Sequence, residues 1–299
     1  MKIIITGCLG YVGTEVLKYF KNSPHEIIGI DQDFIPDKVK KMLRDGYKFY
    51  QRDIFDIADI LKDADICYHF AAITKVPQTI NQSNKEIDSL IYNVGINGTR
   101  YILNNTDSKC KIVFASTHVV WEGLETSVFD IEEDYPVKPV LAYAKSKYQS
   151  ELDIINSGRR FVIARLATVY GYNESTRFSV LNLFSKLASQ SQPIKLFGGG
   201  DNYKSFVGIK DVARAMIDFA NYTKYDNNIF LLCNDNLTVK EVANICIENN
   251  PRINLTTTND EVINKGYTVS HKKITNLGFR FKQSARSEIK KMINMWSNK

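Results

Sequence analysis

Two residues suited to acid/base chemistry, Tyr143 and Lys147, are four positions apart in the stretch LAYAKSKYQSEL. Residues with this spacing are neighbours on one face of a helix. A free tyrosine has a pKa near 10, and about 4 kcal/mol is needed to bring it to about 7. One cation at about 4 Å in a partly shielded site supplies about that much. The pair could therefore move a proton to or from a substrate oxygen beside a hydride acceptor.

The spacing alone does not establish this chemistry. Sixteen tyrosines in a lysine-rich chain of 299 residues should give about one such pair by chance, and this pair is the only one. The alternative is a packing tyrosine followed by a solvated lysine. Apolar residues in this helix predict a core-facing stripe that leaves Tyr143 and Lys147 on a neighbouring face. The predicted stripe comprises Leu141, Ala144, Tyr148, Leu152 and Ile155.

A glycine-rich loop, TGCLGYVG, follows the first apolar stretch of the chain at residues 2–6. Gly7, Gly10 and Gly13 permit a tight turn, close approach of a pyrophosphate, and close packing of a helix on a strand. The backbone N–H groups of a helix that begins there face the phosphates. Strand, loop and helix in this order predict a dinucleotide site.

Asp31 ends the second apolar stretch, where a carboxylate can bind the ribose hydroxyls of an adenosine. A 2′-phosphate would meet this charge and that of Asp33, and no basic residue follows before Lys38. The sequence therefore predicts NAD rather than NADP, with a simple turn cap as the alternative role of Asp31. The predicted cofactor-binding residues are Gly7, Gly10, Tyr11, Val12, Gly13, Asp31, Gln32, Asp53, Ile54, Phe70, Ala71, Ala72, Ser116, Tyr143 and Lys147.

Apolar stretches typical of buried strands alternate with amphipathic stretches typical of helices. Continuous apolar strands separated by helices predict an α/β fold with a Rossmann-type, doubly wound parallel sheet. Ligands of such sheets bind at the carboxyl ends of the strands. We expect strands at 2–6, 26–30, 47–51, 65–72, 111–116 and 161–166, and helices at 11–21, 55–62, 85–104, 141–155 and 210–222.

After about residue 166 the elements become shorter and are interrupted by glycine, proline and asparagine. We therefore expect an NAD-binding domain at 1–166 plus about 205–223. A smaller, interleaved α/β substrate-binding lobe is expected at 167–204 and 224–299.

Composition limits the class of protein. Hydrophobic residues make up 44% of the chain and charged residues 24%, as in a globular enzyme, and no apolar run approaches a membrane span. Five scattered cysteines without a CxxC pair argue for reduced thiols in the cytoplasm and against a zinc site. Residues 265–299 carry nine Lys or Arg against the single acid Glu288. A solvated helix face explains this segment most simply, and nucleic-acid binding or a nearby anionic substrate are the alternatives.

The motifs, taken in order, resemble an extended short-chain dehydrogenase/reductase of the nucleotide-sugar epimerase/dehydratase group. The resemblance covers nearly the whole chain, and GGGDNYKSFVGIKDVARA at 198–215 is similar to the substrate-side motif of the group. It rests on TGxxGxxG, Asp31, HFAA at 69–72, Ser116-Thr117, Tyr143-x-x-x-Lys147 and RLATVYG at 165–171.

This resemblance implies a nucleotide-diphosphate sugar as substrate and a homodimer formed through the helices at 85–104 and 141–155. It assigns catalysis to Thr117, Tyr143 and Lys147. The implied substrate-binding residues are Thr117, Tyr143, Thr168 and Lys204. His118, which departs from the pattern of the group, could also touch the substrate, with a structural role as the alternative.

Several positions depart from the pattern of the group. Dehydratases commonly have an acidic pair after the strand-end threonine, where this chain has His118 and Val119, so a 4,6-dehydratase is not expected. STHVVWEG at 116–123 looks more like the STDYVFDG stretch of 4-keto-6-deoxy sugar reductases. Lys204 replaces a phosphate-contacting arginine and cannot offer a bidentate grip.

Two further departures concern asparagines of the group. Gly95 stands where the long helix usually has one, and Thr168 stands where another often faces the sugar. These changes leave the cofactor motifs intact and leave the identity of the sugar open.

We expect an NAD-dependent nucleotide-sugar epimerase that acts through a transient 4-keto sugar. Tyr143 would take the hydroxyl proton while hydride passes to NAD, and the ketone would turn over and receive hydride on its other face. An NAD(P)H-dependent reductase of nucleotide 4-keto-6-deoxy sugars is the alternative. A nucleotide-sensing scaffold does not explain the retained Thr117, Tyr143 and Lys147. Neither nucleic acid nor a membrane is expected as a partner.

Overall fold

The computed structural model of the protein describes residues 1–74, 84–258 and 266–297. Contacts divide the chain into two compact units. The first comprises Met1–Val120, Pro139–Arg165 and Ala213–Phe230, and the second comprises Trp121–Lys138, Leu166–Val212 and Leu231–Lys299. The assignment of the cofactor to one predicted lobe and of the substrate to the other stays a prediction.

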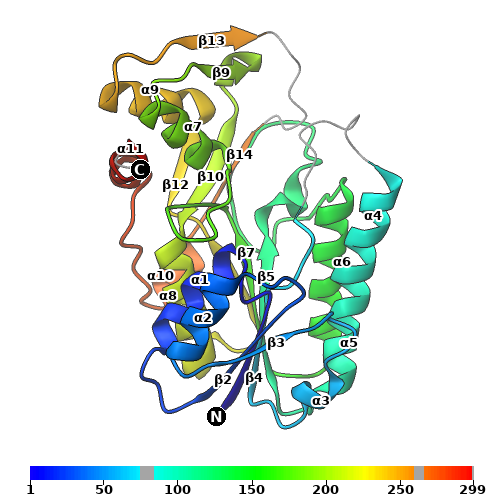
Figure 1. The fold of residues 1–299 in the computed structure, drawn as a ribbon. Coiled ribbons are helices and arrows are strands. Elements are labelled where there is room, and N and C mark those ends of the chain that lie inside the picture. The colour runs from blue at the N-terminus through cyan, green and yellow to red at the C-terminus, as the bar shows by residue number, and fades with distance from the viewer. Residues whose placement is uncertain (75–83, 259–265, 298–299) are drawn as a thin grey trace. The chain divides into compact units, whose positions relative to one another are not determined.

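A parallel sheet forms the centre of the first unit (Figure 1). Among the described residues it has seven strands in the order β3-β2-β1-β4-β5-β7-β11, and the pairs β2–β3, β1–β2, β1–β4 and β4–β5 are parallel. The order reverses between β1 and β4, which makes their carboxyl ends the switch point where such sheets bind ligands. The strands are β1 (Lys2–Thr6), β2 (Glu26–Asp31), β3 (Lys48–Gln51), β4 (Ile66–His69), β5 (Lys111–Thr117), β7 (Phe161–Leu166) and β11 (Asn228–Leu232).

Helices cover both faces of this sheet, so the predicted Rossmann-type, doubly wound α/β fold is confirmed. Helices α4, α5 and α6 lie together on one face, and α1, α2 and α8 lie on the other (Figure 1). The helices are α1 (Tyr11–Leu17), α2 (Pro36–Arg44), α3 (Ala58–Leu61), α4 (Lys85–Tyr92), α5 (Gly98–Asn105), α6 (Ala142–Asn156) and α8 (Ile209–Asn221). Shorter helical turns are η1 (Lys18–Phe20), the π-helical η3 (Asn93–Asn97), η4 (His118–Trp121) and η6 (Thr223–Tyr225).

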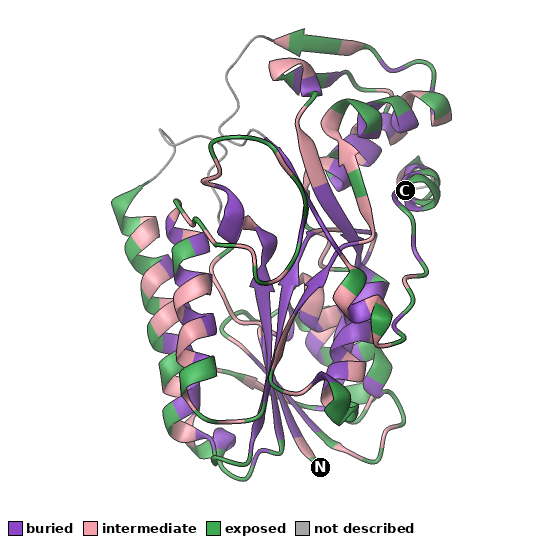
Figure 2. Ribbon diagram, turned by 180° about the vertical axis from the view of Figure 1, so that it is seen from behind, coloured by how far each residue is buried: buried purple, intermediate pink, exposed green. Residues whose placement is uncertain are grey.

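The central strands are buried because helices cover both of their faces. Every residue of β5 and of β7 is buried, and the central strands are almost wholly purple in Figure 2. On the side of α5 and α6, Ile102 and Ile154 pack into one apolar cluster with Ile112 and Phe114 of β5. In the part of the chain that the structure describes, no helix has the length and apolar composition needed to cross a membrane.

The apolar stripe predicted for α6 is wrong. Ile155 is 37% exposed, and Leu141, Tyr148 and Leu152 are only half-buried. Lys147 therefore lies on the buried face of the helix and not beside it. The buried residues of α6 are Ala142, Ala144, Ser146, Lys147, Ser150, Glu151 and Ile154.

Small, hydrogen-bonded side chains explain this polar buried face. Ser146 donates to the carbonyl oxygen of Ile91 at 3.3 Å, and Ser150 donates to that of Gly95 at 3.0 Å. Gly95 lies in the π-helical turn η3, and a Cβ atom there would stand 1.9 Å from Ser146 Oγ. A buried polar group costs little once it is hydrogen-bonded, so α6 can pack tightly against α4 and η3 through serines.

The second unit has shorter strands and a core of its own. Among its described residues, β12, β10 and β8 form one sheet in that order, and β13–β9 and β14–β6 form two further pairs. Helix α11 packs against α7 and α9. The strands are β6 (Val128–Ile131), β8 (Thr168–Tyr170), β9 (Ile194–Phe197), β10 (Tyr203–Gly208), β12 (Asp235–Thr238), β13 (Leu255–Thr258) and β14 (Tyr267–Val269). The helices are α7 (Val180–Ser189), η5 (Gly198–Gly200), α9 (Val239–Asn249), α10 (Lys272–Asn276) and α11 (Ala285–Ser297).

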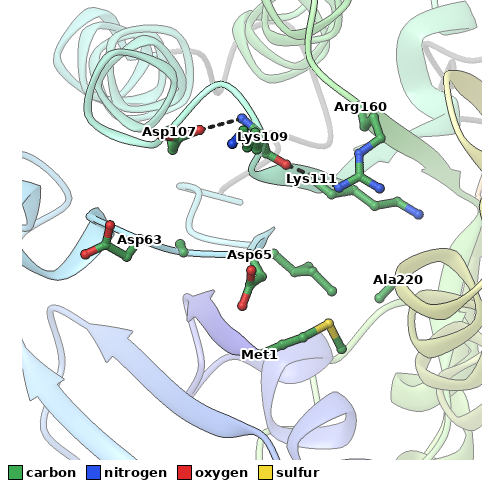
Figure 3. Close-up of a pocket in the computed structure, with 10 residues that line it drawn as sticks. Met1, Asp63, Asp65, Asp107, Lys109, Lys111, Arg160 and Ala220 are labelled. Atoms are coloured by element: carbon green, nitrogen blue, oxygen red, sulfur yellow. Dashed lines mark hydrogen bonds between the residues drawn. The ribbon is translucent and has the colours of Figure 1, made fainter.

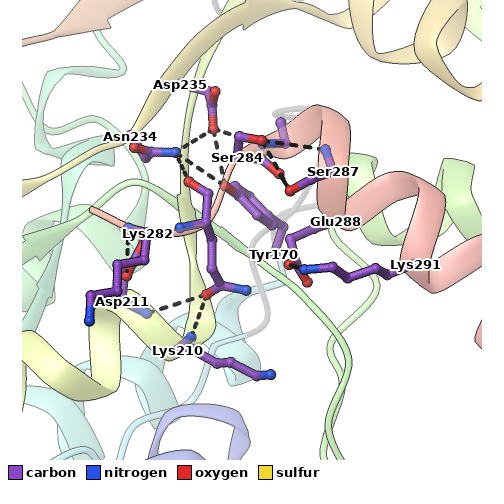
Figure 4. A network of polar contacts seen from close by, with 12 residues as sticks. Tyr170, Lys210, Asp211, Asn234, Asp235, Lys282, Ser284, Ser287, Glu288 and Lys291 are labelled. Atoms are coloured by element: carbon purple, nitrogen blue, oxygen red, sulfur yellow. Dashed lines mark hydrogen bonds and ion pairs between the residues drawn. The ribbon is translucent and has the colours of Figure 1, made fainter. Parts of the chain in front are cut away.

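A polar network holds the chain that leads into α11 (Figure 4). The Asp211 carboxylate accepts the backbone N–H groups of Lys282 and Gln283, each at 2.9 Å. Asp235 accepts the backbone N–H of Ala285 at 3.0 Å. Two buried or half-buried carboxylates thus fix the start of the last helix.

Helix α11 carries three residues of the basic C-terminal segment, Arg286, Lys290 and Lys291. This helix buries Ile289 and Met292, and on its other side Arg286 pairs with Glu248. The three basic residues of this amphipathic helix are exposed to water, whereas Glu288 is buried. Helix α11 is thus a solvated helix face, whereas Arg280 and Lys282 precede it.

We expect Gly95→Ala to destabilise the protein by about 1–3 kcal/mol, because the new methyl group would overlap Ser146 Oγ in a packed interior. The matched test is the same substitution in a Ser146→Ala background, where the overlapping oxygen is gone. Urea unfolding of the four variants should show a smaller cost of Gly95→Ala in that background. An equal cost in both backgrounds would mean that Ser146 is not the reason for the glycine.

Candidate active site

The glycine-rich loop lies at the switch point of the sheet. Gly7 follows β1 with a φ of +68°, and a Cβ atom on it would stand 2.7 Å from the backbone nitrogen of Ala71, which follows β4. A Cβ atom on Gly13 would stand 2.4 Å from the carbonyl oxygen of Gly7. Gly10 is exposed and opens α1. The first and third glycines are thus required by packing, and the second leaves space at the start of a helix.

Asp31 is tied to this loop. Its Oδ2 atom accepts the backbone N–H of Leu9 at 2.9 Å, and its Oδ1 atom accepts that of Asp33 at 3.2 Å. Burial raises the pKa of Asp31, and the hydrogen bond from Leu9 opposes this. Lys38 Nζ donates to the Leu9 carbonyl oxygen at 3.2 Å, so side chains hold Leu9 from both ends of the residue.

The predicted cofactor residues of the first unit follow the carboxyl ends of parallel strands, and the fold brings these ends to one edge of the sheet. Gln32 follows β2, Asp53 and Ile54 follow β3, and the 70–72 stretch follows β4. Gln32 and Asp53 are exposed, whereas Ile54 is buried. Tyr11 and Val12, in the first turn of α1, are half-buried, as are Phe70, Ala71 and Ala72.

Lys147 is buried against β5. Its Nζ atom donates to the carbonyl oxygen of Ala115 at 2.7 Å and lies 4.4 Å from the centre of the Phe114 ring. Burial lowers the pKa of Lys147 to about 7, and the Glu151 carboxylate opposes this shift. The ammonium is thus poised between its charged and neutral forms near neutral pH, and a developing negative charge nearby would favour the charged form.

Tyr143 and Thr117 belong to the same two elements. Tyr143 is half-buried in the first turn of α6, one turn before Lys147, and Thr117 is the last residue of β5. Thr117 Oγ1 accepts the backbone N–H of Val119 at 3.3 Å and keeps its own O–H group as a donor. His118 is buried in the turn η4 that follows. The structure therefore supports Tyr143 and Lys147 as neighbours on one helix that packs on the strand carrying Thr117.

A buried histidine connects the glycine loop to the π-helical turn η3. His69 Nδ1 lies 3.0 Å from Thr6 Oγ1, and His69 Nε2 lies 3.0 Å from Thr99 Oγ1. The Thr99 hydroxyl donates to the Gly95 carbonyl oxygen at 2.6 Å, so it must accept from His69 Nε2. Burial lowers the pKa of His69 to about 3, with the Lys147 charge as a second cause, so the ring is neutral.

Two site-related residues were missed at the sequence level. Glu151 and Arg165 form a buried ion pair in which Arg165 Nη2 lies 2.8 Å from Glu151 Oε2. Ser116, predicted to bind the cofactor, donates its hydroxyl to Glu151 Oε1. The signal available in the sequence was a glutamate four residues after Lys147, on the same face of the helix.

The predicted substrate residues Thr168 and Lys204 belong to the second unit. Thr168 begins β8, and Lys204 is half-buried in β10. Burial lowers the pKa of Lys204, and the nearby Glu122 carboxylate raises it. Part of the Lys204 charge is therefore balanced by the protein itself.

A pocket of about 490 Å³ lies at the opposite edge of the sheet, by the amino ends of β1, β4 and β5 (Figure 3). Asp65 accepts the backbone N–H of Lys2 at 2.7 Å, Lys111 pairs with Asp226, and Arg160 donates to a backbone carbonyl. These charges already have protein partners. The pocket lies at the end of the strands where such sheets do not bind their cofactor.

The observed loop fits a dinucleotide. The exposed Gly10 at the start of α1 leaves room for phosphates, and the Asp31 carboxylate stands at the end of β2 where a ribose would lie. Fold, loop and strand-end carboxylate define a dinucleotide-binding α/β protein.

Comparison with known proteins narrows this class. The model of the NAD-dependent epimerase/dehydratase family matches residues 3–232, so the chain belongs to this family of NAD-dependent enzymes. The resemblance recognised in the motifs is thereby confirmed, as are the enzyme class and the cofactor NAD.

Individual relatives are distant. The chain is 27% identical over 239 residues to a putative UDP-glucose 4-epimerase of Methanocaldococcus jannaschii, a match that covers 76% of each chain. It is 27% identical over 216 residues to the spore coat polysaccharide biosynthesis protein SpsK of Bacillus subtilis, covering 72% of this chain and 68% of that one. The UDP-glucuronic acid 4-epimerase of Bacillus cereus, solved with UDP-glucuronic acid and NAD, has a TM-score of 0.85 at 20% identity, covering 100% of this chain and 99% of that one. This last likeness concerns the fold.

We expect Gly7→Ala to reduce both stability and NAD binding. The change adds backbone strain of about 1–2 kcal/mol and forces the Cβ atom against the backbone after β4. Gly158→Ala is the matched control, because Gly158 has a φ of +69° and no atom within 4 Å of its would-be Cβ. Denaturant unfolding and NAD titration should show a clearly larger loss for Gly7→Ala. Equal losses in the two variants would mean that the close contact with Ala71 is not the reason for a glycine at position 7.

Proposed function

We propose that this protein is an NAD-dependent nucleotide-sugar 4-epimerase with a UDP-sugar as its substrate. The observation that carries the proposal is the placement of Tyr143 and Lys147 on α6, with Lys147 bonded to the strand that ends at Thr117. Membership of the NAD-dependent epimerase/dehydratase family supports the cofactor. The names of the relatives, a putative UDP-glucose 4-epimerase and a UDP-glucuronic acid 4-epimerase, support the choice of sugar nucleotide and carbon.

NAD held by the glycine loop and Asp31 would supply the hydride acceptor, and its reduced form the hydride donor, within one turnover. Tyr143 takes the proton of the C4 hydroxyl and later gives it back to the oxygen of the opposite configuration. The Thr117 hydroxyl hydrogen-bonds the same oxygen, and the Lys147 ammonium stabilises the phenolate of Tyr143 by its charge. Between these steps the 4-keto sugar turns over and presents its other face.

Three further residues are assigned to binding the sugar and the diphosphate of the substrate. We assign the sugar to Thr168 and His118, and the diphosphate to Lys204. Since Lys204 also interacts with Glu122, its grip on phosphate should be weaker than that of an unopposed arginine.

A homodimer formed through residues 85–104, which include α4, and through α6 is part of the proposal. The apolar side chains of Leu90 and Ile155 are 49% and 37% exposed on these helices. Burying them against a second copy would stabilise a dimer by the hydrophobic effect. Light scattering of the wild type and of Leu90→Glu should distinguish a dimer from a monomer.

The cofactor test distinguishes an epimerase from a one-way reductase. An epimerase recycles its NAD, so denatured protein should release NAD in nearly stoichiometric amount. A site that is empty on purification but responds to NADH would favour the 4-keto-6-deoxy-sugar reductase. Conversion of UDP-sugars, followed by NMR, then names the substrate, and no binding of nicotinamide at all would contradict both functions.

We expect Tyr143→Phe to lower kcat at least about 100-fold with NAD binding largely retained, because the variant has no proton to exchange. Tyr148→Phe is the matched control, since Tyr148 is half-buried on the same helix and has no assigned role. Turnover assays and NAD titration on both variants provide the measurement. Unchanged turnover in Tyr143→Phe would refute the role of this tyrosine.

A further inference from the structure

Glu151 is the most completely enclosed carboxylate near the proposed catalytic pair. Its relative exposure is 0%, and that of its partner Arg165 is 3%. Arg165 Nε lies 3.1 Å and 3.2 Å from the two carboxylate oxygens, and Nη2 lies 2.8 Å from Oε2. The Ser116 hydroxyl donates to Oε1. Arginine and serine, from the strands β7 and β5, therefore hold both oxygens of this carboxylate.

In this arrangement the carboxylate of Glu151 is bound by other residues and is not the hydrogen-bond partner of Lys147. Glutamate and lysine four apart on a helix are neighbours and commonly form an ion pair. Here the carboxylate of Glu151 is bound by Arg165 and Ser116, while the Lys147 ammonium is bound to the carbonyl oxygen of Ala115. Lys147 is thus directed to the strand that ends at Thr117, and Glu151 acts on it at a distance by its charge.

We propose that Glu151, held by Arg165 and Ser116, is a positioning residue that favours the charged form of Lys147 and leaves it bound to the β5 backbone. The assignment rests on the proposed role of Lys147 beside Tyr143. The effect of Glu151 on the pKa of Lys147 can nevertheless be measured without turnover.

Charge balance supports the assignment. Lys147 is buried, and burial alone favours its neutral form. The negative charge of Glu151 is the one acidic influence on Lys147 that the described residues provide. If Arg165 and Ser116 did not hold Glu151, its carboxylate would be able to pair with Lys147 and draw the lysine away from β5.

Other groups that face Lys147 do not supply this charge. His69 of β4 is neutral and would oppose a positive charge if protonated. The Phe114 ring and the Ala115 carbonyl of β5 offer only dipolar contacts. On its own helix, Tyr143 is the group that Lys147 is proposed to serve, and the serines on the side of η3 carry no charge.

The primary test is Glu151→Gln, which keeps the shape of the side chain, removes its charge and replaces one of its two acceptor oxygens with an NH2 donor. We expect the pKa of Lys147 to fall by at least about half a pH unit, because a stabilising opposite charge is lost. The alkaline limb of the kcat profile should move to lower pH by the same amount, with KM little changed. NMR of 13C-labelled lysines follows the titration in the full protein, and Lys147→Arg identifies the signal.

Arg165→Lys should act in the opposite direction. A lysine keeps the positive charge but cannot hold both carboxylate oxygens as arginine does, which releases Glu151 toward Lys147. The pKa of Lys147 should then rise, and kcat should fall at its optimum because the ammonium leaves the Ala115 carbonyl. Opposite shifts in the two variants are not expected from a cluster that serves stability alone.

The control is Glu288→Gln, which removes a buried carboxylate that pairs with Lys291 at 2.6 Å on α11, in the second unit. This variant should leave the titration of Lys147 unchanged. An unchanged Lys147 titration in Glu151→Gln, or shifts of the same sign in Glu151→Gln and Arg165→Lys, would overturn the proposal. If the wild type converts no UDP-sugar, the proposed function fails while the Lys147 titration still decides the role of Glu151.

Discussion

A central constraint on the first unit is the positive charge of Lys147, which lies on the buried face of α6. A lysine in the protein interior is costly unless its N–H groups are bonded and its charge is balanced. The Ala115 carbonyl provides the bond, the Phe114 ring provides a favourable surface, and Glu151 provides the balancing charge. Each contact requires α6 to lie close to β5, so the register between this helix and this strand is a condition of the chemistry.

The same requirement explains why α6 has a polar buried face. Ser146 and Ser150 allow the π-helical turn η3 to approach, and Gly95 makes the approach possible. Thr99 then carries the hydrogen-bonded chain through His69 to Thr6, at the end of β1. A continuous set of buried hydrogen bonds thus joins the helix of the proposed catalytic pair to the strand that enters the glycine loop. Such networks favour a single arrangement because each unpaired member would be costly.

The departures from the family pattern either lie outside this hydrogen-bond network or leave its hydrogen bonds in place. Gly95 lacks the usual asparagine side chain, yet its carbonyl oxygen accepts from both Thr99 and Ser150. Lys204, which replaces an arginine, lies in the second unit beside Glu122. The parts concerned with NAD are retained, and the variation is greatest where the sugar nucleotide is proposed to bind. This pattern is expected when related enzymes share a reaction and differ in substrate.

The sequence by itself determined the parallel sheet, the glycine loop, Asp31 at the end of β2, and the helix that carries Tyr143 and Lys147, because local patterns of apolar residues and glycine specify these features. Periodicity misjudged the buried face of α6, since Ser146, Lys147, Ser150 and Glu151 count as polar whether or not they find partners. Those partners come from β5, β7 and η3, which are distant in the chain. Only the tertiary structure decided that Lys147 is buried and that Arg165 and Ser116 hold Glu151, because burial of a charge depends on groups that no local pattern contains.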